Sequence, residues 1–546
     1  MTVSIALTVL VILTFASDNS AADLEFTRLY NEYLPAISTL EDFSIDDSRS
    51  NNTRKYDWIQ YNNISFDDPA INVTRQDNAT NNCSERSVDD FPEIFTLEQR
   101  RRGAAILHIF FEFYCFILTA FVCNDYLLPT LDIICTRLNI SSDVAGATFL
   151  ATASCFPELF VNVVGTFLTE SDLGIGTVMG SAVFNTFATP ACGALLAINA
   201  ISLEWRILTR DCIIYVISVT TLVIVMWDGV IKLYEAIILM VLFVTYLTIL
   251  FCGKYFVRWY NKLAHLFTDK NASTIISEKK IPKDKEESMP AGLYRPYFHG
   301  ELVEEYRKSI VNNGHKSSSV NDVEMQNHME QVEEYVELDT PFVWPTGNNL
   351  AKIWFWFVWP LRLILFVTIP DSRYKRWRSW YMITFVICVI WIAISSYLTS
   401  WMTTVLGDTI GIPDSVVGIT FQAAGGNMPE LVSIVILSKQ GNGDMAMSNT
   451  LGANTLDILL CLGLPWMIKI LINKKDIKII SDALSYSVLS IIVCIIAFYV
   501  VTAFCKYRLD RKVGIICVIL YTIFLVFALM FELNVFFPVN LPMCPS

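Results

Sequence analysis

The sequence has few charged residues and almost no histidine. Only 17% of its 546 residues are Asp, Glu, Lys or Arg, and five residues are His. The sequence shows no spacing typical of a catalytic nucleophile and its general base, so it does not predict an enzyme. We expect no bound cofactor and no nucleic-acid partner for this chain, whose formal net charge is −13.

The chain also lacks the alternating apolar and polar pattern of β-strands. Instead, 53% of the residues are hydrophobic and the mean hydropathy is +0.46. Apolar runs of about 20 residues recur, and each is long enough to cross the hydrocarbon core of a membrane. Backbone groups in lipid must find partners inside the protein, which helices provide. The sequence therefore predicts an all-α polytopic membrane protein surrounded by lipid.

The first hundred residues differ from the rest of the chain. Residues 1–17 hold a short apolar run that ends in small residues, which is typical of a signal peptide. Residues 18–102 are acidic, with seventeen Asp and Glu between Asp18 and Glu98 against six Lys and Arg. We expect this segment to be an extracellular, glycosylated tail. Its five Asn-x-Ser/Thr sequons lie at Asn51, Asn63, Asn72, Asn78 and Asn82.

Most of the 14 cysteines lie inside apolar runs and do not have the spacing of a metal site. Cys83 and Cys544 alone lie in the polar ends of the chain. Both are predicted to lie outside the cell, in an oxidising compartment, and we expect them to form a disulfide bond.

Ten membrane-spanning helices are predicted, in two groups of five. The first membrane repeat occupies 103–252, a cytoplasmic loop occupies 253–350, and the second membrane repeat occupies 380–546. The positions of Lys and Arg near span ends place this loop inside, although Lys474, Lys475 and Lys478 then lie outside. The predicted spans lie near 105–127, 143–167, 174–200, 211–228, 231–252, 380–404, 415–437, 445–468, 483–505 and 513–536.

A further apolar stretch, 353–369, has basic residues on both sides. We therefore expect 351–379 to re-enter the membrane or to lie in its plane rather than to cross it. The two repeats then have opposite orientations, which is the architecture of many secondary transporters. We place the protein in the plasma membrane, with an organellar membrane as the alternative.

One segment occurs twice, at a constant offset of 272 residues. VAGATFLATASCFPEL at 144–159 matches VVGITFQAAGGNMPEL at 416–431, and the match continues into the following helix. It pairs Pro157 with Pro429 and Glu158 with Glu430. Chance similarity between two apolar helices does not predict a shared Pro-Glu pair at one register.

A proline beside a carboxylate inside a membrane helix predicts a cation site. The proline frees a carbonyl in the preceding turn, and the carboxylate is costly unless it is paired or functional. Two breaks related by a pseudo-twofold axis bring Glu158 and Glu430 together, and their oxygens suit Ca²⁺. The alternative is that the two carboxylates bind no cation and only form hydrogen bonds between packed helices. The predicted ligand set also includes Asn185, Asp457, Ser154, Ser181, Asn427, Thr148 and Thr420.

The segments DVAGATF, GTVMGSAVFN and GDMAMSNTLG resemble the alpha repeats of the potassium-dependent sodium/calcium exchangers, here at 143–200 and 414–468. The resemblance covers most of the membrane part but neither the tail nor the large loop. It implies antiport by alternating access, in which Na⁺ enters and Ca²⁺ leaves with K⁺. It also implies that Glu158 and Glu430 coordinate calcium and sodium, and that Asp457 accounts for potassium dependence.

The sequence departs from the family's pattern at hydroxyl positions. Cys155, Gly426, Asn427 and Ala453 replace residues that are usually Ser or Thr, although Asn427 still has a carbonyl oxygen to offer. Hydroxyl oxygens are typical sodium ligands in this family, so two alternatives stay open. One is a cation antiporter of the same fold without potassium or sodium coupling, for example a calcium/proton antiporter. The other is a relative without transport activity that acts as a regulator.

Overall fold

A computed structural model describes residues 87–138, 142–197, 200–267, 349–374, 376–439, 443–479, 481, 483–533 and 535. The predicted signal peptide, the five sequons, Cys83, Cys544 and most of the predicted loop lie outside the described residues. The described part of the chain is almost wholly helical, which confirms the all-α prediction. Seven of these helices are long and apolar enough to cross a membrane, and the bent pair Gly146–Ser154 and Phe156–Phe167 would make eight. The protein is therefore a multi-pass membrane protein.

The first repeat begins with a long helical rod and continues with two interrupted helices. A 3₁₀ turn, η1 (Ser87–Asp90), precedes the rod, which comprises α3 (Leu97–Gln99), η2 (Arg100–Ala104), α4 (Ala105–Phe121), η3 (Val122–Leu127) and α5 (Leu128–Leu138). The first interrupted helix comprises α6 (Ser142–Ala145), η4 (Gly146–Leu150), α7 (Ala151–Ser154) and α8 (Phe156–Phe167). The second comprises α9 (Leu173–Val183), η5 (Phe184–Ala188) and α10 (Thr189–Leu196), and α11 (Trp205–Met226) and α12 (Leu233–Phe267) follow.

The second repeat has the same order of elements. It begins with η6 (Arg378–Trp380) and α16 (Tyr381–Ile410). Its first interrupted helix comprises α17 (Asp414–Val417), η7 (Gly418–Gln422), α18 (Ala423–Gly426) and α19 (Met428–Lys439). Its second comprises α20 (Gly443–Leu456), η8 (Asp457–Leu462) and α21 (Gly463–Asn473), and α22 (Ala483–Phe504) and α23 (Arg511–Glu532) follow.

Two short strand pairs show that the repeats are inverted. β1 (Ile201–Ser202), which precedes α11, pairs with β4 (Arg508–Leu509), which follows α22. β2 (Val230–Ile231), which follows α11, pairs with β3 (Ile477–Lys478), which precedes α22. The start of α11 thus lies beside the end of α22, so these equivalent helices pack antiparallel. The inverted arrangement predicted from the sequence is confirmed.

Two equivalent aspartates, Asp172 and Asp444, accept hydrogen bonds from the opposite repeat. A carboxylate oxygen of Asp444 accepts a hydrogen bond from the backbone N–H of Glu204, just before α11, at 2.6 Å. A carboxylate oxygen of Asp172 accepts one from the backbone N–H of Ser481, just before α22, also at 2.6 Å. Negative charge near the N-terminus of a helix is stabilising. Each interrupted helix pair therefore holds the outer helix of the opposite repeat.

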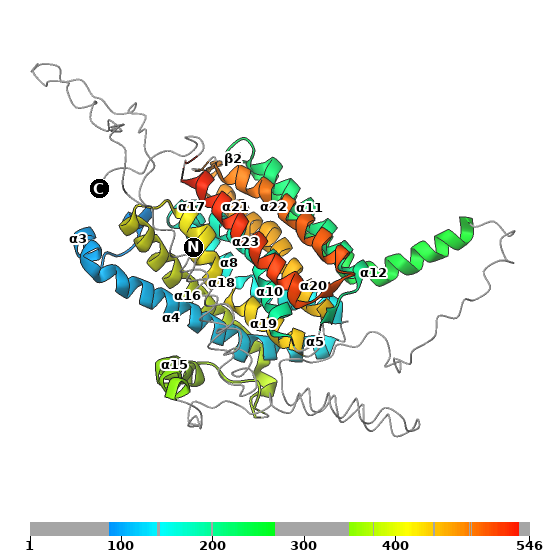
Figure 1. Cartoon of the computed structure of the whole chain (residues 1–546), viewed down its shortest axis with the longest axis horizontal. Helices are drawn as coiled ribbons and strands as arrows, with labels where there is room; N and C mark the ends of the chain where they lie inside the picture. The colour runs from blue at the N-terminus through cyan, green and yellow to red at the C-terminus, as the bar shows by residue number, and fades with distance from the viewer. Residues whose placement is uncertain are drawn as a thin grey trace, which may run out of the picture.

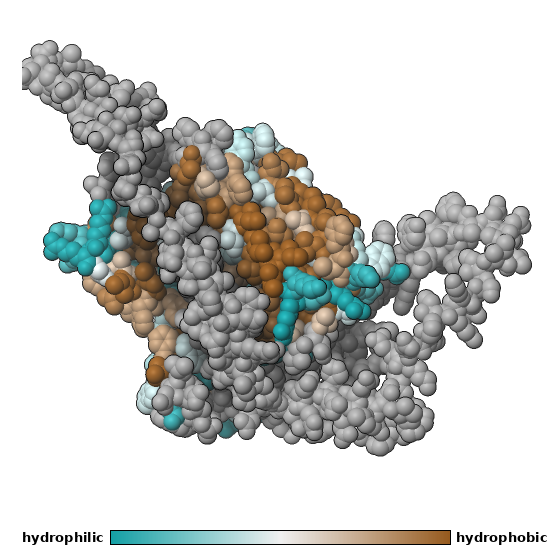
Figure 2. Space-filling model, viewed as in Figure 1, coloured by the Kyte–Doolittle hydropathy of each residue, from teal (hydrophilic) through white to brown (hydrophobic). Residues whose placement is uncertain are grey.

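The interrupted helices lie at the centre of the molecule (Figure 1). α4 and α16 pack against each other on one side of them, and α11, α22 and α23 lie side by side on the other. Figure 2 shows that the outer face over α22 and α23 is apolar, and its exposed side chains include Val493, Ile496 and Phe527. An apolar outside with carboxylates buried inside is the pattern expected where lipid is the solvent.

The stretch predicted to lie in the membrane plane forms α15 (Asn349–Thr368), which is not one of the seven helices counted above. Its Phe357 ring contacts Phe110 of α4, with centroids 5.8 Å apart, and the Arg362 guanidinium lies 5.0 Å from the centroid of the Phe121 ring. Figure 1 shows α15 nearly end-on, whereas α4 and α16 run across the view. α15 and α4 therefore do not run in the same direction, and the in-plane placement of 351–379 stays a prediction.

Candidate ion-binding site

The two predicted helix breaks are present at equivalent positions. The first separates α7 from α8 at Cys155, where the two parts are bent by 48°. The second separates α18 from α19 at Asn427. Pro157 and Pro429 have no N–H and cannot donate to the carbonyls four residues earlier. Each break is preceded by a π-helical turn, η4 or η7, and such turns are frequent at functional sites.

Glu158 and Glu430 follow these prolines in the first turns of α8 and α19. Their side chains are only 2% and 1% exposed. The Oε1 atom of Glu158 accepts a hydrogen bond from the Ser181 hydroxyl at 3.4 Å. The Oε2 atom of each glutamate is buried and has no hydrogen-bond donor among the described residues. Glu430 and Asp457 both lie near Glu158. Buried acidic oxygens without partners are costly in a membrane interior, and a bound cation would remove that cost.

An amide network joins the two repeats beside Glu158. The Asn427 Oδ1 atom accepts a hydrogen bond from Asn185 at 2.6 Å, and the Asn427 Nδ2 group donates to the Ser181 hydroxyl at 2.8 Å. Thr189 in turn donates to Asn185 Oδ1 at 2.9 Å. Asn427, Asn185 and Ser181 are completely buried. The carbonyl that the sequence offered as a cation ligand is therefore already an acceptor for Asn185.

Asp457 is buried at the start of η8, with two thiols close to its carboxylate. The Cys461 thiol donates to Asp457 Oδ1 at 3.7 Å. The Cys155 thiol lies within hydrogen-bonding distance of the carbonyls of Ala151 and Ala453, at 2.8 and 3.3 Å. One carboxylate oxygen of Asp457 and the sulfur atoms of Cys155 and Cys461 all lie within 4.8 Å of one another.

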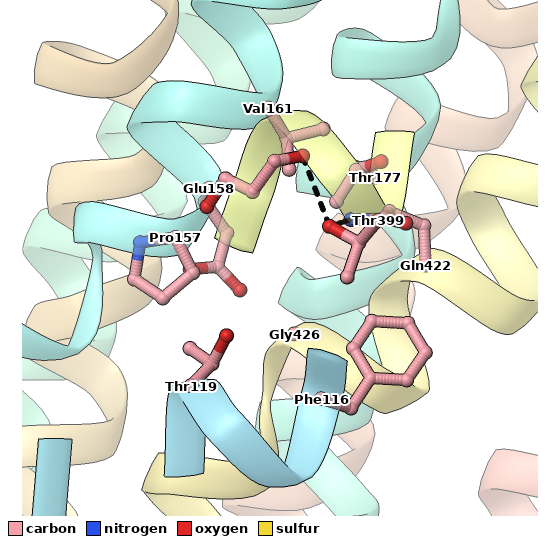
Figure 3. A pocket seen from close by; sticks show the side chains of 10 residues that line it. Phe116, Thr119, Pro157, Glu158, Val161, Thr177, Thr399, Gln422 and Gly426 are labelled. Atoms are coloured by element: carbon pink, nitrogen blue, oxygen red, sulfur yellow. Dashed lines mark hydrogen bonds between the residues drawn. The ribbon is translucent and has the colours of Figure 1, made fainter. Parts of the chain in front are cut away.

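A small pocket reaches Glu158 from between α4 and α16. Figure 3 shows the Glu158 carboxylate pointing into the space that Thr119 and Gly426 border. A Cβ atom at Gly426 would lie 3.1 Å from Glu158 Oε1, so this position faces the carboxylate without a side chain. On the far wall, the Gln422 amide donates to the Thr399 hydroxyl at 3.2 Å. The pocket therefore places a small space beside the Glu158 carboxylate, between α4 and α16.

The remaining predicted ligands lie in the turns before the breaks. Thr148 and Thr420 donate their hydroxyl hydrogens to the carbonyls of Val144 and Val416, at 2.5 and 2.8 Å. Ser154 is buried at the last residue before the first break. We call the six residues that lie together the central site: Glu158, Glu430, Asp457, Asn185, Ser181 and Asn427.

α16 has a buried polar face that was not among the predicted site residues. Thr403 donates to Glu112 Oε1 of α4 at 2.6 Å or to Gln422 Oε1 at 2.8 Å. Hydroxyl residues spaced three and four apart in SSYLTSWMTT lie on one side of a helix, and this spacing could have predicted the face. The buried hydroxyl residues are Ser395, Ser396, Thr399, Ser400, Thr403 and Thr404.

Comparison with known proteins places both halves of the central site within one family. Residues 108–252 and 380–530 match the sodium/calcium exchanger protein family. The chain belongs to this family. It is 34% identical to sodium/potassium/calcium exchanger 4 of Homo sapiens, covering 85% of this chain and 87% of that protein. The family resemblance stated from the motifs is confirmed.

Other members of the family show a similar level of identity. Sodium/potassium/calcium exchanger 3 of Homo sapiens is 33% identical, covering 85% of this chain and 86% of that protein. The probable sodium/potassium/calcium exchanger CG1090 of Drosophila melanogaster is 31% identical, with the same coverage of 85% and 86%. A solved structure of the sodium-calcium exchanger NCX_Mj gives a TM-score of 0.42 at 16% identity, covering 77% of this chain and 98% of that chain.

Proposed function

We propose that this exchanger-family protein is a secondary-active antiporter that moves Na⁺ in one direction and Ca²⁺ with K⁺ in the other. The observation that carries the proposal is the pair Glu158 and Glu430, each buried after an equivalent helix break with one oxygen lacking a donor. A divalent hard cation bound by both carboxylates would offset their charge. The relatives named as sodium/potassium/calcium exchangers support the choice of ions.

The inverted repeats supply the means of alternating access. η4 of the first repeat packs on α20 of the second, and η7 of the second packs on α9 of the first. Each half of the site is therefore held by the opposite repeat, and movement of one repeat against the other would open the site to either side in turn.

Asp457 gives the central site a third negative charge, since the equivalent residue of the first repeat is the neutral Asn185. Three carboxylates balance one Ca²⁺ and one monovalent cation, and an unbalanced charge at this depth is costly. We propose that K⁺ binds near Asp457 while Ca²⁺ lies between Glu158 and Glu430.

Two features of the site favour a second candidate, an antiporter of the same fold without potassium or sodium coupling. Cys155 and Cys461 lie beside Asp457, and Gly426 offers no hydroxyl to an ion at Glu158. Sulfur is a poor ligand for hard monovalent ions, which favour oxygen. For this candidate, calcium flux would be independent of potassium, of sodium, or of both ions.

We further propose that the protein works in the plasma membrane, with the acidic tail outside, and that it needs no cofactor beyond the transported ions. An epitope tag at Ser318 should then be reached by antibody only after cells are permeabilised. Glycosidase should also increase the mobility of the protein through the sequons at 51–82. Staining of intact cells at the tag would reverse the orientation.

Calcium uptake into cells with an outward sodium gradient tests the proposed function. We expect uptake that requires internal Na⁺, falls when Li⁺ replaces it, and rises with external K⁺. Uptake that needs Na⁺ but ignores K⁺, or that needs only a proton gradient, would support the second candidate. A protein that reaches the membrane but carries no calcium under any gradient would be a regulator rather than an antiporter.

A further inference from the structure

One group of side chains at the interface of the repeats has chemistry that calcium exchange does not use. Cys155, Cys461 and Asp457 are buried, and their two sulfur atoms and one carboxylate oxygen lie within 4.8 Å of one another. In a tetrahedral zinc site with Zn–S bonds of about 2.3 Å, neighbouring ligand atoms are about 3.8 Å apart. Shifts of about 1 Å or less would therefore bring all three atoms into contact with a single ion.

We propose that Cys155, Cys461 and Asp457 bind a soft divalent cation such as Zn²⁺ or Cd²⁺, and that an ion held there blocks transport. Thiolate ligands select such ions, whereas Ca²⁺ takes oxygen ligands. The site therefore adds a second ion preference next to the proposed calcium site. The binding claim stands alone, and only the blocking claim rests on the proposed function.

The charge balance favours binding of a soft ion at these thiols. In the described structure each thiol is a hydrogen-bond donor, Cys461 to Asp457 Oδ1 and Cys155 to a backbone carbonyl. When a divalent ion binds, two metal–sulfur bonds form, two S–H bonds break, and two protons leave for water. One M²⁺ thus replaces two H⁺, and the net charge of the buried site does not change. Burying an uncompensated charge would be far more costly.

An ion at this site would connect the two repeats. Cys155 belongs to the break before α8 in the first repeat, whereas Asp457 and Cys461 lie one turn apart on η8 in the second. α8 and η8 pack together, and the Cys461 thiol lies 3.5 Å from the Cys155 carbonyl oxygen. Bonds from one ion to both segments would oppose the relative movement that alternating access requires.

Titration of the purified full-length protein with CdCl₂ tests the binding claim. The protein is kept in detergent without calcium and with a reductant that is not a thiol, and thiolate-to-cadmium absorbance in the ultraviolet reports binding. Cys155→Ser and Cys461→Ser should each weaken cadmium binding by about tenfold or more. Cys192→Ser is the matched control, because Cys192 is also buried in a membrane helix but lies in α10, outside this group. Equal binding by all three variants would overturn the proposal.

X-ray absorption spectroscopy identifies the atoms that bind zinc in the unsubstituted protein, so it tests the binding site even if a variant does not fold. With one zinc ion per chain, we expect two sulfur neighbours at about 2.3 Å and oxygen for the rest of the shell. A shell without sulfur would overturn the proposal.

The blocking claim is measured separately, as cadmium inhibition of sodium-driven calcium uptake. The half-inhibitory cadmium concentration should rise about tenfold in Cys461→Ser, measured against that variant's own uninhibited flux. Cadmium that binds without reducing flux would refute the blocking claim. Absence of any calcium flux would refute the proposed function and leave the binding result intact.

Discussion

Replacing Gly180 with alanine should destabilise the protein far more than the same change at Gly452, although the two glycines are equivalent in the repeats. A Cβ atom at Gly180 would lie 2.4 Å from the carbonyl oxygen of Ile419 and 2.5 Å from the Cβ atom of Ala423. A Cβ atom at Gly452 would lie 3.1 Å from the nearest atoms of Ala147. Since ordinary contacts are about 3.5–4.0 Å, Gly180→Ala requires α9 and η7 to separate by roughly 1 Å, whereas Gly452→Ala requires a few tenths.

Two opposing contributions set the change in the free energy of unfolding. Alanine is favoured over glycine inside a helix by about 0.8–1.0 kcal/mol. Overpacking a tight interface costs about 1–3 kcal/mol, and the backbone oxygen of Ile419 cannot rotate away as a side chain could. We therefore expect a net loss of up to about 2 kcal/mol for Gly180→Ala, where the overlap is severe, and a change near zero for Gly452→Ala.

Thermal unfolding of the purified variants in detergent, followed by tryptophan fluorescence, measures this difference. The Gly180 variant should unfold at a clearly lower temperature than the parent protein, and the Gly452 variant should unfold close to it. If both variants matched the parent, α9 and η7 would not be packed as closely as described. If the Gly452 variant were the less stable one, the α9–η7 interface at Gly180 would not be the tighter of the two.

The Asp457→Asn variant should retain some sodium-driven calcium uptake but lose the response to potassium. The substitution removes the third negative charge and makes the two repeats alike at this position. An undiminished potassium response would exclude Asp457 as the potassium ligand. Arg100→Ala should lower the unfolding temperature, since Arg100 is 2% exposed and forms an ion pair with Asp408 at 3.1 Å. Removing one partner of such a buried pair costs about 3–5 kcal/mol. Arg102→Ala is the matched control, because its ion pair with Glu98 is exposed and contributes about 1 kcal/mol or less. Equal unfolding temperatures for the two arginine variants would show that the Arg100 pair does not stabilise the fold.

The repeat in the sequence predicted much of the fold and the centre of the site. A fixed offset of 272 residues paired Glu158 with Glu430 and both prolines with each other, and the structure places both glutamates after helix breaks. The inversion depended on one topological prediction, that residues 353–369 do not cross. The strand pairs at 201–202 and 230–231 show the inversion independently.

Features that arise between helices could not be predicted in the same way. Cys155 and Cys461 are 306 residues apart, and the packing of the two repeats, including α8 on η8, brings them together. The sequence could have predicted two of the three members of that group, because Asp457 and Cys461 are four residues apart and so lie on one side of a helix. The bond between Asn427 and Asn185 likewise needs both repeats in place. Pairwise contacts of this kind leave no periodic pattern in a single sequence.

If Glu158 and Glu430 together hold the transported calcium, the neutral variants Glu158→Gln and Glu430→Gln should abolish transport. Glutamine keeps the shape of the side chain and removes the charge that offsets the dehydration of Ca²⁺. The measurement is calcium uptake driven by an outward sodium gradient, at equal amounts of protein in the membrane, with Glu98→Gln as the exposed control. We expect each central variant to lose uptake while the control keeps it. Near-normal uptake by either central variant would show that its carboxylate does not hold the transported calcium.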